Sequence, residues 1–436
     1  MSTAGKGCVM FFGVGIAAIL IFVYGALAVK LGRWSVTMPM IFVVAGYLLG
    51  PGGVNLLQIS PRTEGMKTLT EVTLALLLFA DASTLDLRQV RRDPTLIARL
   101  LGIGMPLTML FGAACFLGFF PWEGLAFAAL LGAILAPTDA ALGLPIFNDP
   151  KMPVRIRRAL NVESGLNDGI AAPFVMLFIA FATAVETHSH GNWLSSALLE
   201  VAMALLVGAV VGIAGGWFLT KAVDHGWTAE TSEQVAVLGL ALTAYFGSLM
   251  VHGNGFIAAF SGGITFSAAT RNRFGEPTEF TENTGTVLSL VIWTIFGAIA
   301  VPKAIQYTSD WRPITYAILS LTAIRMIPMA LAMRGTGLRR DTVALMGWFG
   351  PRGLASVVFT LIAFMTFKDV GKPIDLLVAA ATWTILLSAL CHGVSAKPLS
   401  FWYSRRLAKA TGPLPELMEL PELRERPSIL RGRHPR

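Results

Sequence analysis

Five ionisable side chains interrupt long apolar stretches of this 436-residue sequence. Three are carboxylates and two are guanidinium groups: Asp139, Glu163, Asp168, Arg325 and Arg352. An ionised group at the depth of a hydrocarbon layer is costly, so each one is a candidate functional residue. Glu163 at an interface, or Arg325 reaching a lipid headgroup, would be the ordinary alternative. Three acids and two bases compensate one another only if folding brings them together, which indicates one common site.

The densest polar segment covers residues 161–169. On a helix, Ser164 and Asp168 are four residues apart and share one face. Glu163 and Asn167 form a second pair of this kind beside them. A hydroxyl and a carboxylate on one face can together bind one desolvated cation, and hard oxygen ligands suit Na⁺, Li⁺ or K⁺ better than a soft metal.

Two proline-containing segments predict interrupted helices. Pro137 precedes Thr138 and Asp139 within an apolar run, and a second apolar run contains residues 350–353, Gly-Pro-Arg-Gly. A broken helix frees carbonyl groups and exposes half-helix dipoles that can coordinate an ion at depth. Two interrupted spans at corresponding positions of two halves are typical of an inverted-repeat transporter whose site lies where the breaks meet.

The composition predicts the elements that position these residues. The chain is 54% hydrophobic and only 14% charged, and its mean hydropathy is +0.66. This is more apolar surface than one soluble core could bury, so we expect an all-α membrane protein. The net charge of +8 does not indicate nucleic-acid binding, because Lys and Arg occur in short clusters between apolar runs. Neither the three cysteines nor the histidines predict a disulfide framework or a metal site.

Apolar segments long enough to cross a bilayer number about thirteen. The two breaks fall in spans five and twelve, so spans 1–6 and 8–13 would be the inverted repeats. The predicted spans are 9–31, 36–52, 67–85, 95–118, 123–144, 159–184, 194–221, 232–251, 254–270, 284–305, 313–333, 341–366 and 374–402.

The distribution of Lys and Arg predicts the orientation. The loops after odd-numbered spans carry most of the basic residues, which identifies those loops as cytoplasmic. The N-terminus would then lie outside and the C-terminus inside, with 403–436 a polar cytoplasmic tail. The basic residues are Lys30, Arg33, Arg88, Arg91, Arg92, Lys151, Arg155, Arg157, Arg158, Lys221, Arg271, Arg273, Arg334, Arg339 and Arg340.

Three motifs together resemble the electroneutral sodium/proton antiporters of the cation:proton antiporter superfamily, of the prokaryotic Asn-Asp type. The motifs are the Thr138-Asp139 pair, the Glu163–Asp168 run and the break at 350–353, and the similarity covers about residues 10–400. The resemblance implies a homodimer in the plasma membrane with two crossing discontinuous helices, spans 5 and 12. Within a transmembrane domain of residues 1–402, spans 4–6 and 11–13 would be the core, and spans 1–3 and 7–10 the dimerising scaffold.

The resemblance also implies residue roles at the cation site. Asp168 would hold either a proton or the cation, with Ser164 and the Thr138 carbonyl as further ligands. Asp139 would lie close by, directly or through water. Asn167 looks like the residue that distinguishes electroneutral members from electrogenic relatives, which have a second Asp there.

Four further residues receive supporting roles from the same resemblance. Glu163 and Arg325 would form a buried structural ion pair, and Arg352 would offset the dipoles at the helix crossing. Asp81, near the inner end of the third span, would line the cytoplasmic funnel, although a loop-facing polar role is equally compatible with its position.

The expected activity is exchange of Na⁺ or Li⁺ for H⁺ by competition at Asp168, one for one and insensitive to membrane potential, in the service of pH homeostasis. A K⁺/H⁺ antiporter is the alternative within transport, because oxygen ligands do not by themselves set the size of the cavity. A cation channel or a membrane sensor is the alternative from another class. We identify no Ser/His, Cys/His or His-Glu metal constellation within the spans, so we expect neither an enzyme nor a cofactor; the pair Ser388 and His392 in the thirteenth span is an exception to this premise that the structure brings out below.

Overall fold

The computed structural model describes residues 3–57, 64–85, 93–139, 142, 149, 151–188, 191–410 and 414–418, and these ranges contain helices and no strand. Parts of the predicted fifth span and of the predicted tail lie outside them. The helices of the first half are α1 Thr3–Arg33, α2 Met38–Leu49, α3 Glu64–Thr84, α5 Pro94–Arg99, α6 Met105–Phe119, α7 Gly124–Ile134, α9 Val154–Glu186 and α10 Trp193–Asp224. The remaining helices are α11 Glu230–Met250, α12 Gly255–Thr270, α13 Gly275–Gln306, α14 Trp311–Leu321, α15 Ala323–Ala332, α16 Arg340–Trp348, α17 Leu354–Val370 and α18 Asp375–Leu407.

Eight helical segments are long and apolar enough to cross a membrane. Three shorter apolar helical segments accompany them, at Met38–Leu49, Pro121–Ile134 and Gly255–Thr270. The prediction of an all-α chain with several membrane-spanning helices is therefore confirmed for the described residues, whereas the count of about thirteen spans stays a prediction. The eight segments are Gly15–Arg33, Pro94–Phe119, Val154–Glu186, Trp193–Asp224, Glu230–Met250, Gly275–Gln306, Trp311–Ala332 and Asp375–Leu407.

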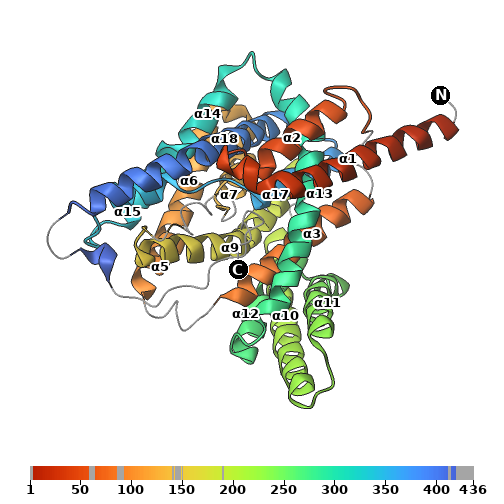
Figure 1. Cartoon of the computed structure of the whole chain (residues 1–436). Coiled ribbons are helices and arrows are strands. Elements are labelled where there is room, and N and C mark those ends of the chain that lie inside the picture. The colour runs from red at the N-terminus through yellow and green to blue at the C-terminus, as the bar shows by residue number, and fades with distance from the viewer. Residues whose placement is uncertain are drawn as a thin grey trace.

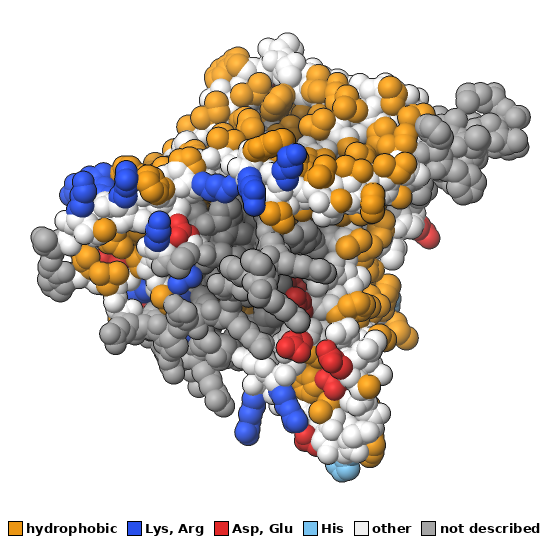
Figure 2. Space-filling view, viewed as in Figure 1, with side chains coloured by type: hydrophobic (Ala, Val, Ile, Leu, Met, Phe, Trp, Pro, Cys, Tyr) orange, Lys and Arg blue, Asp and Glu red, His pale blue; other side chains and the backbone are white. Residues whose placement is uncertain are grey.

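Apolar side chains cover much of the molecular surface, as expected where lipid is the solvent. In Figure 2 they dominate the upper and right parts of the face shown, while Lys and Arg side chains gather along one border of that region. Helix α10 illustrates the pattern, because most of its large hydrophobic side chains are exposed. They are Leu194, Leu198, Leu199, Leu205, Leu206, Val210, Ile213, Trp217 and Phe218.

Small residues allow neighbouring helices to approach closely. A Cβ atom added at Gly208 of α10 would lie 2.0 Å from Ser261 Oγ on α12, and one added at Gly297 of α13 would lie 2.2 Å from Val43 O on α2. Such contacts are typical of helix packing in membranes, where van der Waals contact and not hydrophobic transfer holds helices together. Figure 1 shows α10, α11 and α12 grouped at one end of the molecule, away from α14, α15 and α18.

Both proline-containing segments are non-helical where the structure describes them, at 135–139 and 349–353, and most residues after 139 in the predicted fifth span lie outside the described ranges. Helix α7 ends at Ile134, three residues before Pro137, and residues 349–353 separate α16 from α17. Two interruptions were not predicted. Thr322 separates α14 from α15, and a π-helical turn, Leu100–Gly104, joins α5 to α6.

A cluster of charged side chains joins the ends of four helices. Lys303 at the end of α13 forms an ion pair with Asp375 at the start of α18, at 2.7 Å. Lys372, just before α18, pairs with Glu186 at the end of α9, at 3.2 Å. Glu123, directly before α7, lies in the field of Lys372, Glu186 and Asp375.

Asp310→Asn is expected to destabilise the protein slightly at about pH 7 and to have a smaller effect at about pH 3. A hydrogen bond from Arg312 lowers the pKa of Asp310, which precedes α14 outside the apolar segments. A lowered pKa in the folded state means that the ionised carboxylate contributes stability above the unfolded pKa, and that this contribution is lost as the pH falls through the folded pKa. We expect a fall in Tm on the order of 1 °C at about pH 7, measured by thermal unfolding in detergent.

Candidate cation-binding site

The two helix breaks meet at Asp139. Its backbone N–H donates to Pro351 O at 2.7 Å, and its side-chain Oδ2 accepts from Leu354 N–H at 3.1 Å. Because Leu354 is the first residue of α17, the carboxylate lies at a helix N-terminus, where the free N–H groups and the helix dipole favour negative charge. A Cβ at Gly353 would lie 1.8 Å from Asp139 Oδ2, so the close approach requires glycine there.

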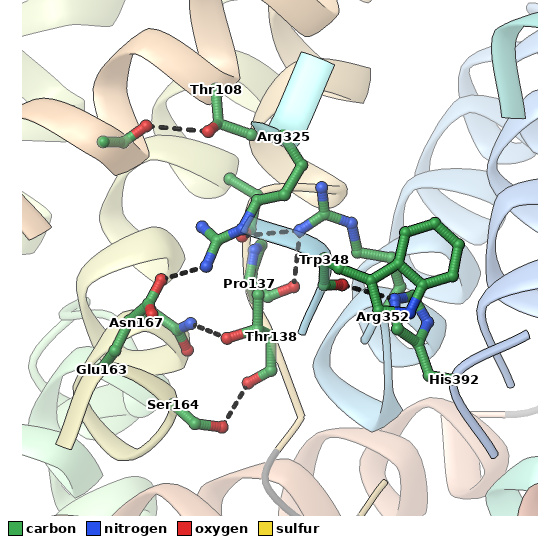
Figure 3. Close-up of polar contacts among 12 residues, drawn as sticks. Thr108, Pro137, Thr138, Glu163, Ser164, Asn167, Arg325, Trp348, Arg352 and His392 are labelled. Atoms are coloured by element: carbon green, nitrogen blue, oxygen red, sulfur yellow. Dashed lines mark hydrogen bonds and ion pairs between the residues drawn. The ribbon is translucent and has the colours of Figure 1, made fainter. Parts of the chain in front are cut away.

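Helix α9 presents the polar face that approaches the break after α7. Ser164 Oγ donates to Thr138 O at 2.7 Å, and Asn167 Nδ2 donates to Thr138 Oγ1, as Figure 3 shows. All three side chains are buried. Asp168 is partly exposed and lies one turn after Ser164 on the same face of α9. The Ser164 hydroxyl and the Thr138 carbonyl are thus brought together at the segment that follows α7.

Arg352 crosses from the second break to the first. Its Nη1 donates to Ala136 O at 3.1 Å and to Pro137 O at 3.4 Å. These carbonyls follow the C-terminal end of α7, where the helix dipole favours a cation. The guanidinium is completely buried, and its role in offsetting the helix dipoles stays a prediction.

Glu163 and Arg325 form an ion pair that joins α9 to α15. Arg325 Nη2 donates to Glu163 Oε1, and each side chain is only 3% exposed. The pair also borders the second break, because a Cβ at Gly350 would lie 2.6 Å from Arg325 Nε. The ion pair that the resemblance implied is therefore present, and its structural role stays a prediction.

The structure therefore brings Ser164 and Asn167 of α9 into contact with Thr138 and joins Asp139 to the second break. Asp81 belongs to the last turns of α3, and its backbone carbonyl accepts from Thr84 Oγ1. The funnel role of Asp81 and the ligand role of Asp168 stay predictions.

Two buried polar contacts were not predicted from the sequence. Glu71 of α3 accepts a hydrogen bond from the Tyr245 hydroxyl of α11 at 2.7 Å. His392 of α18 is 1% exposed, and its Nε2 lies 2.8 Å from Trp348 O. The signal for His392 was an ionisable residue inside an apolar span, four residues after Ser388.

Oxygen atoms predominate around Thr138. Ser164 Oγ and Thr138 O lie together, and Asn167 presents its amide nitrogen to Thr138 Oγ1. Oxygen atoms are the ligands of hard cations. Across the described residues, no cluster of three or more His, Cys, Asp or Glu side chains forms a candidate metal site.

Comparison with known proteins agrees with this geometry. The family model described as "Sodium/hydrogen exchanger, transmembrane" matches residues 16–402. The chain is 23% identical over 402 residues to the K(+)/H(+) antiporter NhaP2 of Shewanella sp. (strain MR-4). This alignment covers 88% of this chain and 65% of the relative. The chain is 26% identical over 294 residues to the Na(+)/H(+) antiporter NhaH of Halobacillus dabanensis, covering 63% of this chain and 68% of the relative.

A solved structure has the same fold. The sodium proton antiporter MjNhaP1 from Methanocaldococcus jannaschii at pH 8 superimposes with a TM-score of 0.73 at 19% sequence identity. The match covers 88% of this chain and 99% of that one. The agreement over almost the whole neighbouring chain supports the helical arrangement that places both breaks beside α9.

Proposed function

This chain belongs to the transmembrane sodium/hydrogen exchanger family, and from that premise we propose that it exchanges a monovalent alkali cation for protons across the plasma membrane. Members of this family are transporters and not enzymes. The observation that carries the proposal is the meeting of both broken segments with the polar face of α9, through Ser164, Thr138 and Asp139. Backbone that is not helical is tolerated at membrane depth where it lines an ion site.

The mechanism rests on competition at one carboxylate. A protonated Asp168 has lost the charge that attracts a cation, and a cation-bound Asp168 excludes the proton, so each transit carries one or the other. Ser164 Oγ and the Thr138 carbonyl complete the ligand set. Because Asn167 is neutral, one cation exchanges for one proton, and the exchange moves no net charge.

Na⁺ or Li⁺ is our first choice of cation, and K⁺ is the alternative. The relatives carry both names, since NhaH is a Na(+)/H(+) antiporter and NhaP2 a K(+)/H(+) antiporter. Hard oxygen ligands accept all three ions, and discrimination depends on ligand number and cavity size.

Two groups of helices would move relative to one another. We propose that α5, α6, α7 and α9 together with α14–α18 form the core, which corresponds to spans 4–6 and 11–13. The helices α1–α3 and α10–α13 form a dimerising scaffold, which corresponds to spans 1–3 and 7–10. The close glycine contacts of α10 with α12 and of α2 with α13 support a rigid scaffold. The proposal includes about thirteen membrane spans arranged as inverted repeats, with the discontinuous helices of spans 5 and 12 crossing. It also includes an external N-terminus and a cytoplasmic C-terminal tail.

Proton flux in reconstituted vesicles tests the function. Outward gradients of Na⁺, Li⁺ and K⁺, each supplied in turn, are expected to drive proton uptake for at least one ion. Clamping the membrane potential at zero or at about 100 mV is expected to leave the rate unchanged, because an electroneutral exchange moves no net charge. If one net charge moved in each cycle, about 100 mV would change its free energy by about 2.3 kcal/mol and the rate would respond. Absence of exchange with every ion would refute antiport, and a cation current without coupled proton flux would identify a channel.

A further inference from the structure

Helix α18 presents a stripe of polar side chains to the break between α16 and α17. Ser388, His392 and Ser395 follow one another at spacings of four and three, which places them on one face of the helix. Ser388 and His392 are almost completely buried. Ser395 Oγ accepts from Trp348 Nε1 at 3.0 Å, so the whole stripe faces the end of α16.

Ser388 and His392 contact backbone groups on both sides of the break. Arg352 N–H donates to Ser388 Oγ at 2.6 Å. His392 Nδ1 lies 3.1 Å from Ser388 Oγ and 2.9 Å from Ser388 O of its own helix, and His392 Nε2 lies 2.8 Å from Trp348 O. Figure 3 shows the imidazole beside the Trp348 carbonyl, with Arg352 next to it.

A neutral imidazole can satisfy the three contacts that join α18 to the break, and it then leaves the contact between Nδ1 and the Ser388 carbonyl of its own helix without a proton. Trp348 O is an acceptor only, so His392 must carry its proton on Nε2 to donate to it. Nδ1 then accepts from the Ser388 hydroxyl, whose oxygen accepts the Arg352 N–H. The neutral imidazole also avoids placing a third cation beside Arg352 and Arg325 in a buried region. The result is a continuous relay from Arg352 N–H to Trp348 O.

The relay satisfies backbone groups that a broken helix leaves without helical partners. Helix ends expose free carbonyl and N–H groups, and burying them unpaired costs free energy. The same five-residue segment carries Pro351 O, which accepts the Asp139 N–H, and the Arg352 side chain, which reaches the carbonyls of Ala136 and Pro137. Displacement of this segment would therefore displace Asp139 and Thr138.

We propose that Ser388 and His392 are positioning residues whose hydrogen-bond relay fixes the break at residues 349–353 and thereby holds the cation site in shape. This inference rests on the proposed function for its effect on cation binding. The relay itself concerns only the backbone of the break. The two parts can therefore be tested separately.

A simpler role for His392 would be to fill space against aromatic side chains. Its ring lies 5.2 Å from the Trp348 ring and 6.2 Å from the Phe349 ring, centroid to centroid. His392→Phe keeps an aromatic ring at this position but removes both hydrogen bonds. His392→Gln keeps one donor and one acceptor without the ring. The two variants therefore separate packing from the relay.

Hydrogen–deuterium exchange of the purified protein tests the relay. Peptides covering residues 349–354 are expected to exchange about tenfold faster in Ser388→Ala, where Arg352 N–H loses its partner, and in His392→Phe, where Trp348 O keeps only the Gly350 N–H and is no longer tied to α18. His392→Gln is expected to stay close to the wild type. Thr384→Val is the matched control, since Thr384 is buried one turn earlier on α18 and donates to Ala380 O of its own helix.

Cation dependence of exchange tests the consequence. The cation concentration at half-maximal rate is expected to rise about tenfold in His392→Phe and Ser388→Ala, with a smaller change in maximal rate. Unchanged protection of residues 349–354 in folded variants, or an equal change in Thr384→Val, would overturn the relay. If His392→Phe yields no folded protein, the smaller change Ser388→Ala decides. If the wild-type protein shows no cation/proton exchange, the proposed function is overturned, and the hydrogen–deuterium exchange measurement alone tests the relay.

Discussion

Asp168→Asn is expected to abolish cation/proton exchange while leaving the protein folded. The substitution keeps the size and polarity of the side chain but removes the charge that compensates a desolvated cation. A buried ion left without its partner costs about 3–5 kcal/mol, which corresponds to roughly a 100- to 5,000-fold loss of affinity. The amide also cannot take up the proton that the return transit would carry, so both halves of the cycle fail.

Cation binding can be measured without transport. A ligand that binds the folded state raises the Tm with its concentration, so the wild type is expected to be stabilised by the cation that it transports. Asp168→Asn is expected to show no such dependence and no proton flux in vesicles. Asp224→Asn is the matched control, because Asp224 forms an exposed ion pair with Arg273 far along α10. Exchange at the wild-type rate by Asp168→Asn would refute the competition mechanism.

The sequence was sufficient to predict the polar face of α9 and both breaks. Ser164 and Asp168 share a face because of helical spacing, and the prolines at 137 and 351 interrupt the helices near their own positions. Both signals are local, because they depend only on residues a few positions apart. The all-helical architecture could be predicted from the composition, because a chain this apolar requires lipid as its solvent.

The partners of the breaks could not be predicted in the same way. Asp139 accepts from Leu354 N–H, and Arg352 N–H donates to Ser388 Oγ, across 215 and 36 residues of sequence. Such contacts depend on how helices pack, which residue spacing does not specify. The break at Thr322 escaped prediction for another reason, since neither glycine nor proline occupies that position.

Breaking the ion pair between Glu163 and Arg325 is expected to have the largest effect on stability. Both side chains are 3% exposed, so Arg325→Ala leaves a buried carboxylate without its partner, at a cost of about 3–5 kcal/mol. We expect the protein to unfold at a markedly lower temperature in detergent and to be recovered in smaller amounts from the membrane. Exchange per folded molecule would also fall, because Arg325 borders Gly350 in the second break.

A double variant separates the ion pair from the individual side chains. Glu163→Leu combined with Arg325→Met removes both charges and keeps apolar volume, and it is expected to recover most of the stability lost in either single variant. Arg273→Ala provides the comparison at an exposed pair, where each side chain is about half exposed and the expected cost is below about 1 kcal/mol. If Arg325→Ala unfolds at the same temperature as Arg273→Ala, the pair does not hold α9 to α15. Losses that simply add in the double variant would mean that the two charges do not act as a pair, so only recovery supports the structural role of Glu163 and Arg325.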